Sequence, residues 1–512
     1  MPPNMADWLP QDHLVWFVLD VVDQLDTTRF HAQMRTGGVG RQGFDPDMLL
    51  ALLLYAYAVG ERSSRRIERL CLDHVAFRVV CGQDAPDHTT IARFRARHQD
   101  AFADVFAQVL RLCAAAGMVK VGIVSIDGTK IAANASRGAN RSGAAVRHEA
   151  QRIAHEIVAE AARVDAAEDA RGDDDDLPPG FADRSGRAAN IKKALAELDA
   201  QDAEHTRADQ GDRHRIEDLL ARLEAGEALH GPVPAGADPI AWYRARITGL
   251  ARHLAELDGL GGIEASRART ELRRRLRRAE QMLAAAEDQA ATGTLDLRGR
   301  AARERARRTR RAQGRGGTGP TVNVSDPDSR LMTHGAGGGS VQGYNAQVAV
   351  TDDHLILGVH VSQDANDTHC FAPALNGAVL AATGLDLQIE TVLADAGYFT
   401  EENLTMPGPD RLIAPGKHRD LPTGTGTDPA PGPAPGDASA KELMRHRLRT
   451  PEAAAIYKRR SATVETLIAH LKDHIGLRRF SRRGLTAATA ELNLAAAVVN
   501  LRRLHTTALA TS

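Results

Sequence analysis

The chain alternates between stretches with a helical pattern of apolar residues and stretches with the pattern of β-strands. In residues 1–118 a continuous apolar run, MLLALLLYAYAV at 48–59, follows the helix start signal DP, and the polar-faced segment ERSSRRIERLCLDHVAFRVV comes next. A further helix is expected after PDHTT, with Thr89 or Thr90 as its cap and IARFRARHQDAFADVFAQVLRLCAAAG as its body. The pattern predicts an all-helical N-terminal domain.

Strand character begins in residues 119–136, VKVGIVSIDGTKIAANAS. It returns at about Gly343, where YNAQVAVTDDHLILGVHVSQ holds two apolar runs on either side of a DD pair, the usual form of a hairpin. After a predicted helix over 368–384, IETVLADAGY adds a short strand. Strands mixed with helices in this way predict an α/β core.

Two long segments separate these strands or follow them. Residues 137–320 are rich in Ala, Arg and Glu with helical periodicity, broken by GDDDDLPPG and GPVPAGADP, and predict an insertion of at least three long helices. Residues 321–512 hold the remaining strands and the C-terminal helices. Within this part the Pro/Gly-rich stretch of 417–440 is expected to be a flexible loop.

Charge is strongly segregated along the chain, although the 512 residues carry a formal net charge of only -1. Residues 298–315 contain nine arginines and one acid, and from Lys441 onward fourteen Lys/Arg face five Asp/Glu. Such stretches suit a polyanion, because each phosphate contact releases counterions. The predicted N-terminal helices offer further candidates for DNA contact, namely Arg65, Arg66, Arg93, Arg95 and Arg97.

The cysteines and apolar runs exclude several other classes of protein. The four cysteines lie far apart without a CxxC pair, which argues against a disulfide framework and a zinc site. No apolar run is long enough to cross a bilayer, and the first residues lack a basic signal-peptide region. A cytoplasmic protein that does not bind membranes is therefore expected.

Three carboxylates stand in positions that suit metal-dependent phosphodiester chemistry. Two-metal cleavage uses carboxylates that converge on two Mg²⁺ ions about 4 Å apart. Asp127 and Asp395 are each expected at the end of a strand, and Glu465 on a helix that could pack across the sheet. A strand-end Asp commonly opens a turn and a helical Glu commonly faces water, so the hypothesis depends on all three together.

The residues around Glu465 strengthen this hypothesis. Tyr457, Arg460, Glu465 and Lys472 form the pattern Y-x2-R-x4-E-x6-K. On a continuous helix Glu465 and Lys472 lie two turns apart on one face, so both Arg460 and Lys472 could contact a phosphate beside the carboxylates. The alternative is a surface ladder of ion pairs, which a spacing of seven does not favour.

The helix YKRRSATVETLIAHLKDHIGLRRFSRRGL resembles the C-terminal signature of bacterial insertion-sequence transposases of the DDE class, in the IS1182-like branch of the IS4/IS5-like group. FDPDMLLALLLYAYAVGERSSRRIERLC and PDHTTIARFRARH are similar to the N-terminal domain of that family. SIDGTKIAANAS and LADAGYFTEENL resemble its two Asp motifs, and SDPDSRLM with GYNAQVAV resembles the block before its central strands. The motifs occur in the expected order over about residues 30–505.

The resemblance implies an RNase H-like core, interrupted after its first strand by the helical insertion. It implies that Asp127, Asp395 and Glu465 bind Mg²⁺ or Mn²⁺, and that the cut-and-paste enzyme cleaves double-stranded DNA at the terminal inverted repeats of its element. The freed 3′-OH groups would then attack target DNA. Because two element ends must be processed together, a homodimer or larger assembly on DNA is expected.

The sequence departs from the family pattern in one region and leaves two other functions open. Many relatives carry a cysteine-bearing stretch between the second Asp and the Glu, whereas residues 401–460 contain no Cys. One alternative is a structure-selective nuclease, which would cleave without joining strands. Another is an inactive or repurposed transposase that only binds DNA, whose binding would be salt-sensitive and independent of metal.

Overall fold

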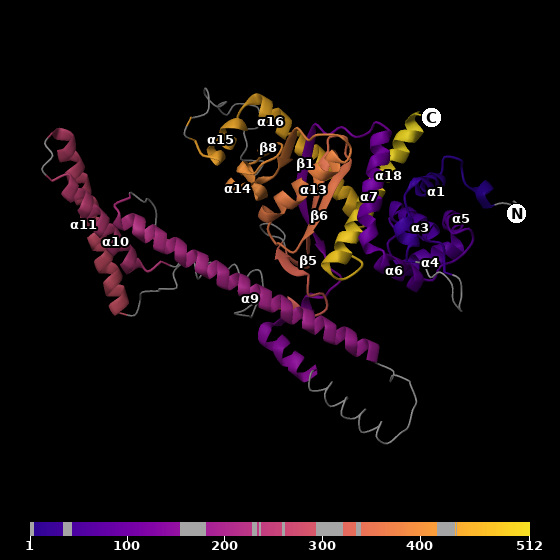
Figure 1. Cartoon of the computed structure of the whole chain (residues 1–512), viewed down its shortest axis with the longest axis horizontal. Helices are drawn as coiled ribbons and strands as arrows, with labels where there is room; N and C mark the ends of the chain where they lie inside the picture. Colours follow the sequence, from indigo (N-terminus) through magenta and orange to yellow (C-terminus); the bar gives the residue numbers. More distant parts are fainter. Residues whose placement is uncertain are drawn as a thin grey trace, which may run out of the picture. The chain divides into compact units, whose positions relative to one another are not determined.

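The computed structural model describes residues 5–33, 43–153, 181–227, 233–234, 237–258, 262–292, 321–333, 339–416, 436 and 438–511. The chain divides into two compact units, one of Met1–Asn140 with Asn323–Ser512 and the other of Arg141–Val322 (Figure 1). The arginine-rich run 298–315 and most of the loop predicted at 417–440 lie outside the described residues. Their proposed roles therefore stay predictions.

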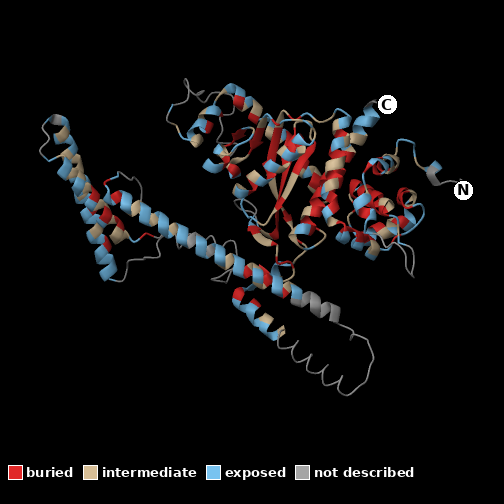
Figure 2. Cartoon of the chain, viewed as in Figure 1, coloured by how far each residue is buried: buried red, intermediate tan, exposed pale blue. Residues whose placement is uncertain are grey.

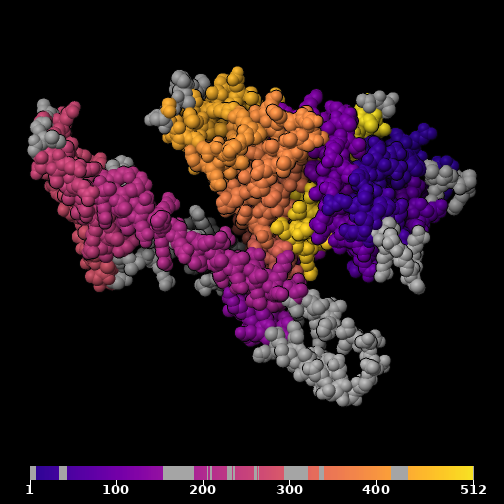
Figure 3. All heavy atoms as spheres, in the orientation of Figure 1, coloured from indigo at the N-terminus to yellow at the C-terminus, as the bar shows by residue number. Residues whose placement is uncertain are grey.

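The first unit begins with short helices that share one apolar core with the C-terminal helix. Figure 3 shows part of that last segment, in yellow, between the N-terminal helices and the strands. The N-terminal elements are η1 (Met5–Trp8), α1 (Leu14–Gln24), α2 (Thr28–His31), α3 (Pro46–Ala58), α4 (Ser64–Asp73), α5 (Val75–Val80), α6 (His88–Arg97), η2 (Gln99–Ala101) and α7 (Phe102–Ala115).

Helix α3 is the centre of this helical part. Asp45 caps it by accepting a hydrogen bond from the Asp47 backbone N–H, and Pro46 occupies its first turn, where no backbone donor is needed. Every residue from Leu49 to Ala58 is buried. A helix that is apolar on all sides must be covered on all sides, and α1, α5 and α18 contact it.

Helix α6 differs from its prediction in two ways. Its cap is Asp87, whose carboxylate accepts hydrogen bonds from the backbone N–H groups of Thr89 and Thr90, so neither threonine is the cap. The predicted long helix also breaks at His98, and a short 3₁₀ turn leads into α7. An Asp two residues before an apparent threonine cap offers two acceptor oxygens to the orphan donors of the first turn, which explains the shift.

His98 is a buried histidine that should make the stability of this unit depend on pH. Its ring is tilted against those of Phe30 and Phe94, and its Nδ1 has no hydrogen-bond partner in the described part of the chain. Burial, together with the nearby charge of Arg97, lowers the pKa of His98 to about 4. As pH falls from about 6.5 toward 4, the unfolded chain binds a proton that the folded chain does not, so stability decreases.

We expect His98→Phe to weaken this pH dependence, because phenylalanine keeps the ring packing and does not titrate. The slope of unfolding free energy against pH should decrease by at most about 1.4 kcal/mol per pH unit, the limit for one proton. Denaturant unfolding at pH values from 4 to 7, in parallel with wild type, measures it. An unchanged slope would show that the pKa of His98 is the same in the folded and unfolded chain.

The first unit also contains a six-stranded mixed sheet. The strand order is β4-β5-β1-β7-β8, and β6 pairs with β5 as well. β1 is antiparallel to β5 and parallel to β7, which is parallel to β8. The bounds are β1 (Ile123–Ala132), β4 (Arg330–Thr333), β5 (Ser340–Thr351), β6 (Ile356–Ser362), β7 (Thr391–Ala394) and β8 (Asp410–Ile413).

Helices cover both faces of this sheet, so its strands are largely buried (Figure 2). On β5, Val348 and Val350 belong to the core shared with α3 and α18, whereas Ala349 belongs to a second core with α13. Alternate residues of a strand point to opposite faces, which explains how one strand serves two cores. The predicted hairpin of β5 and β6 is present, with their antiparallel register running from Asn345↔Ser362 to Val350↔Ile356.

The helical elements around the sheet come from the second half of the chain. They are η4 (Thr368–Cys370), α13 (Phe371–Thr383), η5 (Ala396–Tyr398), α14 (Glu401–Thr405), α15 (Ala440–Arg447), α16 (Pro451–Tyr457), η7 (Ser461–Glu465), α17 (Thr466–Asp473) and α18 (Leu485–Thr511). At the end of the predicted loop, Ser439 and Glu442 form a capping box that starts α15. The last residues of that loop are therefore ordered.

The second unit is built on three long helices, as its periodicity predicts. These are α9 (Phe181–Glu224), α10 (Pro239–Glu256) and α11 (Ile263–Ala291); η3 (Arg137–Ala139) precedes the short strand β2 (Asn140–Ser142), which pairs with β3 (Thr321–Asn323). Trp242 and Ala245 of α10 pack with Leu223 of α9. A Cβ at Gly249 would overlap the Leu223 carbonyl oxygen, so a glycine is required where these helices meet.

Candidate catalytic carboxylates

Asp127 and Asp395 lie side by side on the two central parallel strands. The register pairs Ile126 with Ala394, so the next residue of each strand is an aspartate. Asp395 directly follows β7, as predicted. Asp127 does not end its strand, and this corrects the prediction, because β1 continues to Ala132 by pairing with β5 alone. Asp127 nevertheless lies beside the C-terminal end of β7, at the point where the pairing of β1 with β7 stops.

Both aspartates are held in a desolvated environment. Burial raises the pKa of Asp127 to about 6, opposed by the guanidinium of Arg460. Asp127 Oδ2 accepts a hydrogen bond from Arg460 Nη1 at 2.9 Å, and Oδ1 accepts one from the Gly128 backbone N–H at 2.8 Å. Burial also raises the pKa of Asp395, which accepts a hydrogen bond from the Gly397 backbone N–H. Cations should bind strongly here, because water screens these charges poorly.

Glu465 is brought to the same place by a turn of π-helix rather than by the continuous α-helix that we predicted. Residues five apart lie on different faces of an α-helix but are aligned in a π turn, whose hydrogen bonds run from i to i+5. Because η7 ends at Glu465, Arg460 Nη2 reaches Glu465 Oε1 at 3.3 Å.

Arg460 thus joins two of the three carboxylates. Its side chain is only 13% exposed and contacts both Asp127 and Glu465, whose own side chains are 16% and 56% exposed. Thr463 holds this turn on the sheet by donating a hydrogen bond to Ser125 Oγ on β1, at 3.0 Å. The elements that carry Asp127 and Glu465 are therefore in direct contact.

Tyr457 and Lys472 differ in how far they could contact DNA. Tyr457 is 6% exposed, and its hydroxyl donates to the carbonyl oxygen of Ala394, next to Asp395. It anchors α16 on β7, which corrects the prediction that it contacts DNA. Lys472 is partly exposed on α17. Burial lowers the pKa of Lys472, and Asp127 is among the charges that act on it.

The five N-terminal arginines are not equivalent either. Arg65, Arg66, Arg93 and Arg97 are exposed, and Arg66 pairs with Glu61. Arg95 is 7% exposed and donates to Ser64 Oγ, to the Tyr57 hydroxyl and to the Arg62 carbonyl oxygen. It lies on the face of α6 that also buries Ile91 and Phe94, so it is a structural residue, which corrects its predicted contact with DNA.

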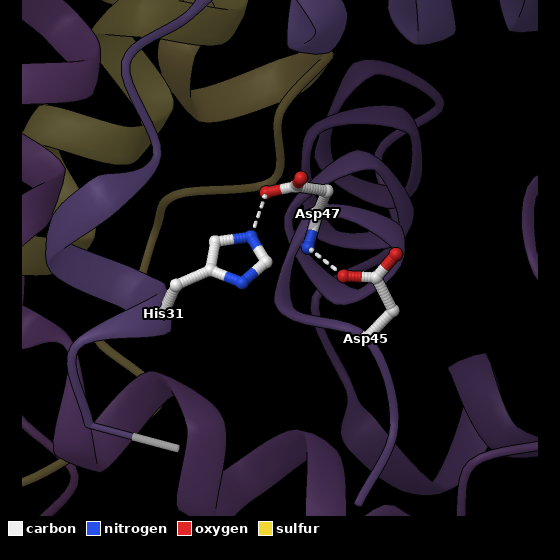
Figure 4. A group of neighbouring side chains, drawn as sticks. All are labelled: His31, Asp45 and Asp47. Carbon is white, nitrogen blue, oxygen red and sulfur yellow. Dashed lines mark hydrogen bonds and ion pairs between the residues drawn. The ribbon is translucent and has the colours of Figure 1, made fainter. Parts of the chain in front are cut away.

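A tight group of possible metal ligands lies elsewhere, at His31, Asp45 and Asp47 (Figure 4). Its hydrogen bonds explain it without an ion. Asp45 caps α3, and Asp47 Oδ1 lies 3.0 Å from His31 Nε2. In the described part of the chain this is the one trio of such ligand atoms all within 4.8 Å of one another. We assign it no metal.

The three predicted carboxylates nevertheless fit a divalent cation by their chemistry. Asp127, Asp395 and Glu465 supply oxygen ligands of the kind that hard cations prefer. The Arg460 guanidinium already compensates Asp127 and Glu465 at their shared position, which shows that this position favours positive charge. Their oxygens do not form a group as compact as that at His31, because the guanidinium lies between two of them.

Sequence reasoning missed two charged residues at this sheet edge. Lys130, on β1, lies with its Nζ 3.8 Å from Asp367 Oδ1, in the turn before η4. Asp367 acts electrostatically on Asp395. No local pattern marks Asp367, which follows a strand as many solvated aspartates do. The only hint of a further side chain at this place is that a glycine follows Asp127 in SIDGTK and another lies two residues after Asp395 in LADAGY.

Comparison with protein families gives two matches, at opposite ends of the chain. Residues 3–97 match the family described as Transposase domain (DUF772), and residues 436–505 match the family described as Transposase DDE domain. The second match contains Glu465 and its neighbours, whereas Asp127 and Asp395 lie outside both. Comparisons with curated proteins and with solved structures found no match.

The two matches support an insertion-sequence DDE transposase. The DDE domain indicates a nuclease or transposase enzyme that depends on a divalent metal. The mixed α/β fold is consistent with this class. None of the helices in the described ranges is both long and apolar enough to cross a membrane.

Proposed function

We propose that this protein binds the terminal inverted repeats of an insertion sequence, cleaves the DNA at those ends and joins the ends to target DNA. The observation that carries the proposal is the placement of Asp127 and Asp395 in register on neighbouring strands, with Arg460 linking Asp127 to Glu465. A group of three carboxylates, two of them desolvated, at the edge of the sheet suits phosphoryl transfer, in which positioning and charge compensation supply most of the catalysis.

The residues of the site would divide the work as follows. Asp127, Asp395 and Glu465 would hold Mg²⁺ or Mn²⁺, which, when bound, supplies Lewis-acid activation of the attacking oxygen and stabilisation of the leaving oxygen. Arg460 and Lys472 would hold phosphate oxygens. Tyr457 would keep Asp395 in place through the Ala394 carbonyl. No covalent link between protein and DNA is needed.

The same proposal assigns roles to the parts of the chain. The mixed sheet with β1 at its centre supports an RNase H-like core formed by residues 119–136 and 321–512. Residues 137–320 would be an insertion into that core, and residues 1–118 would bind DNA. We further propose that the protein is IS1182-like, acts as a homodimer or larger assembly on double-stranded DNA, and resides in the bacterial cytoplasm with the nucleoid.

The experiment that tests the proposal is an in vitro reaction of the purified protein with Mg²⁺, labelled inverted-repeat DNA and a target plasmid. We expect cleavage at the repeat ends and products in which the ends are joined to the plasmid. Cleavage without joined products would indicate a structure-selective nuclease instead. Salt-sensitive binding without cleavage under Mg²⁺ or Mn²⁺ would indicate an inactive transposase that only binds DNA.

Arg65 offers a test of the N-terminal helices as a DNA-binding surface. If its exposed guanidinium neutralises one phosphate, Arg65→Ala should weaken binding to all duplexes and lower the slope of log K against log salt by about 0.9. Fluorescence anisotropy at several salt concentrations measures this. Arg111→Ala, an exposed arginine on α7, is the matched control. Equal slopes for Arg65→Ala and wild type would remove α4 from the interface.

A further inference from the structure

Asp367 lies at the edge of the site, and its carboxylate is held in one orientation. Asn345 Nδ2 donates to Asp367 Oδ1 at 2.8 Å and Gln347 Nε2 donates to it at 3.2 Å. Lys130 Nζ lies 3.8 Å from the same oxygen. Among the described residues these three partners all contact Oδ1 of Asp367, which leaves Oδ2 available to bind an ion. The Asp367 side chain is 26% exposed, so an ion could reach it from solvent.

The groups that orient Asp367 are buried. Asn345 and Gln347 are 0% exposed, both on β5. The Asn345 Oδ1 atom has no hydrogen-bond partner in the described chain. A buried amide oxygen without a partner destabilises the fold, so the retention of asparagine here needs a reason. The hydrogen bond from Asn345 Nδ2 to Asp367 supplies this reason, because carboxylates that bind metals are oriented by hydrogen bonds from residues that do not themselves touch the metal.

Two glycines leave room for Asp367 on either side. A Cβ at Gly128, next to Asp127, would lie 2.7 Å from Asp367 Oδ1. A Cβ at Gly397, in the turn after Asp395, would lie 3.0 Å from Asp395 Oδ1 and 3.3 Å from Asp367 Oδ2. Any larger residue at Gly128 would clash with Gln347 and Asp367, and one at Gly397 would crowd Asp395 and Asp367. The glycine in each Asp motif thus has a steric reason.

Asp367 and Asp395 also approach a common point beside Gly397. The position that a Cβ of Gly397 would occupy lies within contact distance of both Asp367 Oδ2 and Asp395 Oδ1. Thr368 fixes this arrangement, because its hydroxyl donates to the Gly397 carbonyl oxygen at 3.2 Å. The free oxygen of Asp367 is therefore the one turned toward Asp395.

We propose that Asp367 is a fourth carboxylate ligand of the divalent cation site, with Oδ2 sharing an ion with Asp395. The inference rests on the proposed function, since it adds a ligand to that same site. Lys130 balances the charge of Asp367 from the other oxygen. The site then contains four carboxylates, three of them on the sheet or in the turns that adjoin it, and Glu465 on the helical segment.

Binding of Mn²⁺ to the full-length protein without DNA, measured by calorimetry or by electron paramagnetic resonance, tests the inference. We expect Asp367→Asn to weaken Mn²⁺ binding at least about 10-fold, as Asp395→Asn should, since each removes a ligand. Asparagine keeps the size of the side chain and an oxygen for Asn345, so the fold should persist. Asp364→Asn, three residues away and exposed, is the matched control and should bind as wild type does.

Three outcomes separate the possibilities. Loss of affinity in Asp367→Asn and Asp395→Asn, with thermal unfolding in the absence of metal unchanged, supports the inference. Wild-type affinity of Asp367→Asn beside weakened Asp395→Asn overturns it and leaves the proposed function standing. Wild-type affinity of both overturns the proposed site itself. If Asp367→Asn unfolds more easily, Asn345→Ala provides a second test, because it keeps the carboxylate, removes the shorter of its two amide hydrogen bonds and should also weaken Mn²⁺ binding.

Discussion

Replacing Asp395 with alanine is expected to lower the rate of Mg²⁺-dependent cleavage of inverted-repeat DNA by more than about 100-fold. Removing even an outer partner of a metal ligand commonly costs 10- to about 100-fold, and Asp395 would be a direct ligand. Its carboxylate is partly buried and lies beside Asp127, where burial raises its pKa. Single-turnover cleavage of end-labelled DNA measures the rate of the chemical step.

DNA affinity separates this effect from general damage to the protein. Asp395→Ala should bind inverted-repeat DNA in the absence of metal about as tightly as wild type, because the N-terminal arginines are untouched. Glu402→Ala, an exposed acid on α14 just beyond the same turn, serves as the control and should cleave normally. Equal cleavage rates for Asp395→Ala and wild type would refute the assignment of the site.

Replacing Glu491 with alanine is expected to destabilise the first unit by about 3–5 kcal/mol, the cost of removing one partner from a buried ion pair. Glu491 is 5% exposed on α18. It accepts hydrogen bonds from Arg62 at 2.6 Å, from the Ser481 backbone N–H at 2.7 Å and from the Tyr57 hydroxyl at 3.3 Å. Without it, the partly buried guanidinium of Arg62 loses its charged partner and the buried hydroxyl of Tyr57 loses its acceptor.

Denaturant unfolding followed by circular dichroism measures this loss. Glu491→Gln keeps an acceptor oxygen and should cost less than alanine, whereas Glu452→Ala, exposed on α16, should change stability by less than about 0.5 kcal/mol. A change of similar size in Glu491→Ala and Glu452→Ala would show that the network adds no stability. The network matters for function because it joins α3 and α4, which lead to Arg65, to the C-terminal helix.

The sequence predicted the elements of the core well because their patterns are local. The alternating apolar residues of β5 and β6 and the short strand before Asp395 lie where periodicity placed them, and long helices occur in the helix-rich segment between β2 and β3. The cap of α6 was misplaced by two residues, because Asp87 and the threonines after it are all good capping residues. Only the hydrogen bonds distinguish among them.

Residue type and spacing were less informative about the site. Arg95 and Tyr457 have the side chains expected of residues that contact DNA, but both are buried and make structural hydrogen bonds. A long polar side chain can pack into the core as easily as it can extend into solvent. Its role therefore depends on which face of the helix it lies on, and a shift of one residue along the helix changes that face. Asp367 was missed because its partners come from β1 and β5, far away in the chain.

By itself the sequence determined the order of elements, the three candidate carboxylates and, through the resemblance of its motifs, the class of enzyme. These depend on local pattern and on residue identity. The tertiary structure decided that β1 and β7 pair in the register that sets Asp127 beside Asp395, and that a π turn brings Glu465 to Arg460. It also decided that Asp367 completes this edge, because strand register and helix packing are settled only when distant segments bury their apolar faces together.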